Sequence, residues 1–168
     1  APGINAYVKC IALAVAHVAS DSTGVKDWEV VVFKDPSANA FALPGGKIGV
    51  HTGILLVAKT AGQLAAVLGH EVGHVIARHG NERVSQAMLA QGGLTLAGAA
   101  LDNKYIMAAL GIGTQGVLLK YSRTNESESD KIGLDLAARS GFDPREAVQL
   151  WKNMSAASSG KQPPQFMS

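Results

Sequence analysis

Apolar residues near the start of the chain recur at intervals of three or four, at Ile4, Val8, Ile11, Val15 and Val18. This spacing puts them on one face, so it predicts an amphipathic α-helix over residues 4–19. A β-branched and aromatic run follows at residues 28–35 and stops at Pro36. Such a run closed by a proline is typical of a strand, and we predict one here.

The segment NAFALPGGKIGVHTG, residues 39–53, contains two extended stretches on either side of a turn. Pro-Gly-Gly at 44–46 predicts the turn, and KIGVHT at 47–52 predicts the strand that follows it. With the strand before them, these residues predict a small sheet of two or three strands.

Two helices are predicted in the middle of the chain. Thr60 and Gln63 have the spacing of a capping box, and helical apolar periodicity follows them. Gly80 is the expected end of this helix. Asn81 is the expected N-cap of the next helix, over residues 81–89.

Two more helices are predicted near the end of the chain. Asn125 and Glu128 again have capping-box spacing, and Gly141 is the expected end of that helix. The sequence DPRE at 143–146 supplies a cap, a first-turn proline and an acid, which predicts a last helix over 144–156. The elements together predict an α+β fold that is mainly α-helical.

Composition narrows the class of protein. A chain of 168 residues fits one domain with a substantial core, and 47% of its residues are hydrophobic while 17% are charged. The net charge is +2 and the basic residues are scattered, so we expect no nucleic acid partner. Cys10 is the single cysteine, which excludes an internal disulfide framework and a cysteine-based zinc site.

Two apolar stretches, residues 88–101 and 105–119, raise the question of a membrane. Polar residues and glycines interrupt both before they reach the roughly 20 apolar residues that a spanning helix needs. We expect buried or surface-docking helices, and peripheral membrane association and a role in oligomerisation stay open. The chain begins without Met and stops after GKQPPQFMS, so we expect truncation at one or both ends of a single domain covering 1–168.

The sequence HEVGH, residues 70–74, carries the clearest chemical signal. His70 and His74 are four residues apart, so on a helix both imidazoles can face one metal ion. Glu71 is rotated about 100° from His70 and reaches towards a metal-bound water instead of the metal. This is the arrangement of a hydrolytic zinc site, in which a carboxylate takes a proton from the attacking water.

A catalytic metal needs a third protein ligand, and three candidates are weighed. His79 lies about 140° round the helix from the second histidine, which favours a cation at the helix C-terminus over a ligand. His51 follows a strand and is a weaker candidate for lining a cleft. Glu126 is the best candidate, with Asp130 one turn later placed to orient a ligating histidine. Glu128 is expected to be solvated, and the whole acidic run can also be read as an exposed helix N-terminus.

Three segments of the chain resemble metallopeptidase family forty-eight, a gluzincin family that includes the CAAX prenyl protease and the Oma peptidases. They are NAFALPGGKIGVHTG, LAAVLGHEVGHVIARHGNER and YSRTNESESDKIGLDLAARSGFDP, in the family's order. The resemblance implies a zincin-like metallopeptidase domain with one zinc ion per chain. It also implies a soluble bacterial branch that is exported to the periplasm or the outer membrane.

The resemblance assigns roles to individual residues. It implies that His70, His74 and Glu126 are the zinc ligands, that Glu71 is the general base and that Asp130 supports a ligand. It further implies an edge strand that binds the substrate backbone, and Arg123 as a residue that positions the site. The residues of that expected edge strand are Gly46, Lys47, Ile48, Gly49 and Val50.

The resulting expectation is a zinc-dependent endopeptidase that cleaves extended or unfolded polypeptides, in particular misfolded or unassembled proteins. One alternative is a chaperone-like or assembly module that keeps the metal and cleaves little. Another is a helical interaction domain without a metal. The oligomeric state, the oxyanion donor and the occupant of the fourth metal position are not determined by the sequence.

Overall fold

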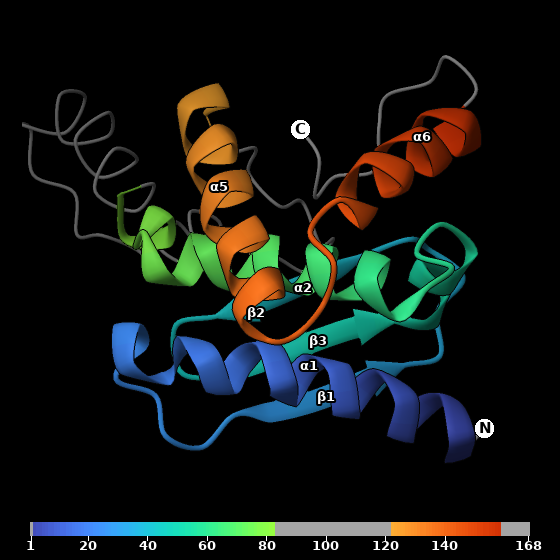
Figure 1. Ribbon diagram of the computed structural model, residues 1–168. Coiled ribbons are helices and arrows are strands. Elements are labelled where there is room, and N and C mark those ends of the chain that lie inside the picture. Colours follow the sequence, from blue (N-terminus) through green and yellow to red (C-terminus); the bar gives the residue numbers. More distant parts are fainter. Residues whose placement is uncertain (1, 83–121, 159–168) are drawn as a thin grey trace, which may run out of the picture.

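The computed structural model describes residues 2–82 and 122–158, which form a small sheet and the helices packed around it (Figure 1). Helix α1 covers Pro2–Thr23, and strands β1, β2 and β3 cover Glu29–Phe33, Ala40–Leu43 and Lys47–His51. A 3₁₀ helix at Thr52–Leu56 leads to α2 at Ala61–Ile76, and α5 and α6 cover Arg123–Arg139 and Glu146–Ser158. The predicted fold, mainly α-helical with a three-stranded sheet, is confirmed.

The sheet has the strand order β1-β3-β2, so β3 lies at its centre. Strand β3 pairs in parallel with β1, with Ile48 opposite Val30. On its other side it pairs in antiparallel fashion with β2, with Ile48 opposite Ala42. The expected edge position of Gly46–Val50 is therefore wrong, because β1 and β2 occupy both sides of this strand.

Helix α2 begins as predicted and ends earlier than predicted. The Thr60 side chain accepts a hydrogen bond from the Gln63 N–H at 3.2 Å, which caps the first turn. The helix ends at Ile76, and Arg78 has a φ of 57°, the left-handed conformation in which an α-helix does not continue. Helical residues resume at 79–82, so the predictions of Gly80 as the end of the helix and Asn81 as the next cap are wrong.

The N-terminus of α5 is capped by a different residue from the one predicted. Ser122 accepts a hydrogen bond from the Asn125 N–H at 3.1 Å, and Asn125 itself is buried inside the first turn. The predicted end is confirmed, since the helix stops at Arg139 and Gly141 follows with a φ of +89°. Helix α6 starts at Glu146, two residues later than predicted, after a turn in which Asp143 accepts from the Arg145 N–H.

Helix α1 contributes one face to the core and leaves the other exposed. Val8 and Val15 are fully buried, and α1 packs against α2 and β1. Among the described residues, α1 alone is long and apolar enough to cross a membrane, which is weak evidence because core helices and signal sequences share this property. The predicted apolar stretches 88–101 and 105–119 lie outside the described residues, as does the end of the chain after residue 158.

Candidate metal centre

Small residues bring α2 and α5 into direct backbone contact. A Cβ built on Gly73 would lie 2.8 Å from Ser129 Oγ, and one built on Gly69 would lie 2.6 Å from the Gly133 carbonyl oxygen. The Ser129 hydroxyl donates a hydrogen bond of 2.6 Å to the His70 carbonyl oxygen. The two helices are thereby fixed side by side, with the buried face of α2 against the segment of α5 from Ser129 to Gly133.

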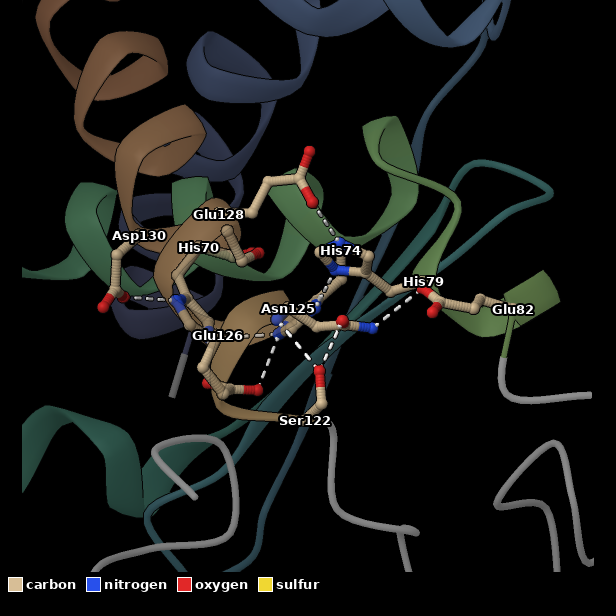
Figure 2. A network of polar contacts seen from close by, with 10 residues as sticks. His70, His74, His79, Glu82, Ser122, Asn125, Glu126, Glu128 and Asp130 are labelled. Atoms are coloured by element: carbon tan, nitrogen blue, oxygen red, sulfur yellow. Dashed lines mark hydrogen bonds and ion pairs between the residues drawn. The ribbon is translucent and has the colours of Figure 1, made fainter. Parts of the chain in front are cut away.

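This packing brings three potential metal donors together (Figure 2). The Nε2 atoms of His70 and His74 lie 3.1 Å apart, and they lie 3.1 and 3.2 Å from the two carboxylate oxygens of Glu126. Tetrahedral zinc with bonds of about 2.0 Å needs donors separated by roughly 3.3 Å. The donors that the sequence predicts for a metal therefore have both the chemistry and the spacing that fit zinc.

Asp130 holds His70 from the side opposite to Glu126. His70 Nδ1 lies 2.8 Å from Asp130 Oδ1 and its Nε2 faces Glu126 (Figure 2). Burial disfavours the charged imidazole, but hydrogen bonds to the two carboxylates outweigh it and raise the pKa of His70 to about 10. Burial opposes ionisation of Glu126 as well, yet hydrogen bonds from His70 and His74 lower its pKa to about 2. The carboxylate is thus kept charged, as a metal ligand must be.

His79 lies against the second histidine of the pair. Its Nδ1 is 2.9 Å from His74 Nδ1, and its Nε2 is 3.0 Å from Glu128 Oε2 (Figure 2). His79 is 2% exposed. His79 was predicted to lie at the C-terminus of the α2 helix, facing away from the site, and this position is wrong, because the turn at Arg78 redirects the chain and brings the ring back to His74. Glu128 is also not simply solvated, although its side chain is more than half exposed.

Glu71 is the least satisfied polar group of the centre. It is buried, and its Oε1 has no hydrogen-bond partner among the described residues. Burial raises the pKa of Glu71 to about 8, with the charge of Glu126 acting in the same direction and that of His70 opposing it. A buried carboxylate without a partner is costly, so an external group that approaches this oxygen, such as a water molecule or a substrate amide, would stabilise it.

Two predicted candidates lie apart from these donors. His51 ends β3, where its ring contacts Phe33 and Phe41 and its Nδ1 lies 2.7 Å from Ser37 Oγ. Arg123 is the first residue of α5 and is exposed. Neither belongs to the described group that can hold a metal ion.

Two cavities border the candidate ligands. One of about 140 Å³ lies between α2, α5 and α6 and has one polar end, formed by His70 and Asp130. Apolar residues form the rest of its lining: Ala66, Val67, Leu134, Ala147, Leu150, Trp151 and Met154. A smaller one, of about 50 Å³, separates Ala42 and Pro44 at the end of β2 from His74. The donor group is therefore approached from both the sheet and α6.

Comparison with known proteins agrees with these features. Residues 2–168 match the model of peptidase family M48. The chain is 42% identical over 137 residues to the mitochondrial metalloendopeptidase OMA1 of Schizosaccharomyces pombe, covering 80% of this chain and 40% of that protein. It is 39% identical over 143 residues to OMA1 of Arabidopsis thaliana, covering 83% and 28% respectively.

A bacterial relative covers almost the whole chain. The beta-barrel assembly-enhancing protease of Escherichia coli is 29% identical over 178 aligned residues, covering 99% of this chain and 36% of that protein. The chain thus spans well under half the length of each of these relatives. The relatives are named as metalloendopeptidases or as a protease, as expected from the sequence. The chain belongs to peptidase family M48.

Proposed function

We propose that this chain is the catalytic domain of a zinc-dependent endopeptidase in which Glu71 is the general base. The observation that carries the proposal is the convergence of two imidazoles and a carboxylate beside a buried, unpartnered Glu71 oxygen. A mere helix–helix contact would gain nothing from a buried carboxylate without a partner. Such a carboxylate is useful where a proton has to be accepted.

His70, His74 and Glu126 would hold one zinc ion. Two histidines and a glutamate with an open position are a ligand set of catalytic zinc sites, and this set favours zinc over harder cations. When bound, zinc lowers the pKa of a water molecule to about 7 and polarises a carbonyl group. Asp130 accepts a hydrogen bond from His70 Nδ1, which leaves Nε2 free to bind the ion.

Glu71 would move the protons of the reaction. Its raised pKa suits a group that accepts a proton from the attacking water near neutral pH. The protonated carboxyl then donates that proton to the leaving amine of the cleaved peptide bond. Burial of the side chain keeps bulk water from competing for this proton.

Strand β2 is the element that we assign to the substrate backbone, in place of β3. The His51 N–H bonds to the carbonyl of Asn39, the residue before β2. In an antiparallel pair every second residue bonds to the partner strand, so the backbone groups of Phe41 and Leu43 also face β3. The N–H and C=O groups of Ala40 and Ala42 are therefore directed away from β3. Ala42 borders the small cavity next to His74, so a substrate strand paired with this edge would pass the metal site.

The cavity between α2, α5 and α6 would take an apolar side chain of the substrate. Its volume of about 140 Å³ approaches that of an engineered cavity of about 150 Å³ that binds benzene. The His70 ring borders the cavity, which places a bound side chain within one residue of the scissile bond. The proposed substrate is an extended or unfolded polypeptide, since a folded chain could not present both its backbone and such a side chain.

The biological setting is proposed from the relatives alone. Two are named as mitochondrial and one is named for enhancement of beta-barrel assembly. We propose that the protein acts on misfolded or unassembled proteins after export, in the periplasm or at the outer membrane of a bacterium. Any membrane association would be peripheral or through α1, the apolar N-terminal helix.

Metal analysis and a cleavage assay on an unfolded protein such as casein test the proposal. The purified chain should contain one zinc ion and cleave casein, a chelator should abolish cleavage, and added zinc should restore it. Zinc binding without any cleavage would instead support a chaperone-like or assembly module. Complete folding without bound metal, and no effect of zinc on stability, would support a helical interaction domain.

A further inference from the structure

We infer that His79 is a positioning residue that fixes the tautomer and orientation of the proposed metal ligand His74, and that Glu128 in turn holds His79. The inference rests on the proposed metal site and adds two residues to it. Both lie outside the three donors, and the sequence assigned neither a role in the site.

The positions of the ring nitrogens determine where the protons lie. If His74 Nε2 binds a metal ion, its lone pair is used there and its proton has to be on Nδ1. That Nδ1 lies 2.9 Å from His79 Nδ1, so His74 donates and His79 accepts. The remaining proton of His79 is then on Nε2, where it is donated to Glu128 Oε2 at 3.0 Å. In these contacts between described residues, each of the two rings donates through one nitrogen and accepts or binds through the other.

The two metal-binding histidines are therefore held in different ways. His70 donates directly to a carboxylate, Asp130, on the same helix as Glu126. His74 is instead connected to the carboxylate of Glu128 through the ring of His79. On the Nδ1 side of the His74 ring, an imidazole and not a carboxylate is therefore the direct partner that orients it.

The backbone around His79 is arranged to make this contact. His79 follows Arg78, whose φ of 57° is the left-handed conformation that residues other than glycine rarely adopt. Without this break, a continuing helix would carry residue 79 away from residue 74. The same turn buries the His79 ring, so that both of its ring nitrogens are paired inside the protein.

The alternative is that His79 is a core residue that stabilises the fold and has no influence on metal binding. The two readings differ in what they predict for zinc affinity. Partners of metal-binding histidines change metal affinity by roughly 10–100-fold when they are removed. A purely structural residue changes the thermal midpoint and leaves the affinity for zinc as it was.

The decisive variants are at Glu128, because its exposed side chain can be changed without disturbing the core. In the full chain, zinc affinity is measured by competition with a chelator. Glu128→Ala should weaken zinc binding several-fold, and Glu128→Gln, whose amide oxygen still accepts from His79, should restore most of it. Asp135→Ala is the matched control, since Asp135 is on the same helix and pairs with Arg139.

His79→Phe keeps a ring and removes both nitrogens. Zinc affinity should fall by about 10–100-fold, and in a nitrogen-15 NMR spectrum of the zinc-loaded protein His74 should lose its protected Nδ1–H signal. Unchanged zinc affinity in both His79→Phe and Glu128→Ala, or no difference between Glu128→Ala and Glu128→Gln, would overturn the inference. A wild-type chain that binds no zinc would instead defeat the proposed function.

Discussion

Gly133 of α5 and His70 of α2 touch through their backbones. A Cβ built on Gly133 would stand 2.6 Å from the His70 amide nitrogen, a distance that real Cβ atoms do not adopt. His70 is a proposed metal ligand, and Glu126 lies two turns before Gly133 on the same helix. The distance between the helices at this point therefore controls how closely Glu126 approaches the two histidines.

Gly133→Ala should separate α2 from α5 and damage the metal site. The added methyl group meets backbone atoms, which cannot rotate away, so we expect a net destabilisation of about 1–3 kcal/mol despite the higher helix propensity of alanine. This corresponds to a thermal midpoint lower by roughly 2–12 °C, and zinc affinity should fall as well. Gly3→Ala is the control, because Gly3 is in α1 and has open space around its Cβ position. Equal thermal midpoints and equal zinc affinities in the two variants would show that the close contact has no role in the site.

Glu71→Gln should abolish cleavage and leave metal binding intact. The amide has the size of the carboxyl group but cannot accept a proton, and loss of a general base typically costs 10²–10⁴-fold in rate. The donors His70, His74 and Glu126 are unchanged, so zinc content measured by elemental analysis should equal that of the wild type. A variant that retained most of its casein cleavage would show that Glu71 is not the base.

Zinc should stabilise the fold in addition to activating the enzyme. The donors come from α2, which ends at Ile76, and α5, which begins at Arg123, so an ion between them links two helices that are distant in the sequence. A free zinc concentration 1,000-fold above the dissociation constant adds about 4 kcal/mol of stability. For a domain of this size the thermal midpoint should rise by roughly 8–16 °C in a zinc titration. Glu126→Ala should remove most of this rise.

The candidate metal donors could be predicted from the sequence because their pattern is local within each of the two helices. The spacing of His70 and His74 follows from helix periodicity, and Glu126 and Asp130 share one face of a second helix for the same reason. The Thr60 cap was equally predictable, since the capping bond spans only three residues. The contact between the two helices was anticipated because a metal held by two histidines needs a third ligand, and the family resemblance supported Glu126 in that role.

The role of His79 could not be predicted because the periodicity argument assumed an unbroken helix. Arg78 in a left-handed conformation breaks that assumption, and no glycine or proline at this position signals it. The central position of β3 was missed for a different reason. A run of residues predicts a strand, but strand order depends on contacts between distant segments, here between Glu29–Phe33 and Lys47–His51.

Ala42→Pro tests the assignment of β2 as the strand that binds the substrate backbone. Proline removes an N–H that points away from β3, so pairing within the sheet should survive while pairing with a substrate strand is lost. We expect kcat/KM for a peptide substrate to fall at least tenfold with little change in zinc content. Val32→Pro is the matched control on β1, at the opposite edge of the sheet. The Glu29 N–H bonds towards β3, and backbone direction alternates along a strand, so the N–H of Val32 points away from β3. A similar loss in both variants would point to damage to the sheet and not to a lost substrate contact.

Ala147→Phe should alter which peptide bonds are cleaved. Ala147 lines the cavity of about 140 Å³, and a phenylalanine there would fill the space that we assign to an apolar substrate side chain. In mass-spectrometric profiles of a digested unfolded protein, the wild type should prefer a large apolar residue at one position beside the cleaved bond. The variant should lose this preference and favour small residues. Val148→Phe is the control, since Val148 is the neighbouring residue, is 60% exposed and does not line the cavity. Cleavage by the wild type without any apolar preference would show that the cavity does not bind the substrate, even though the metal site is active.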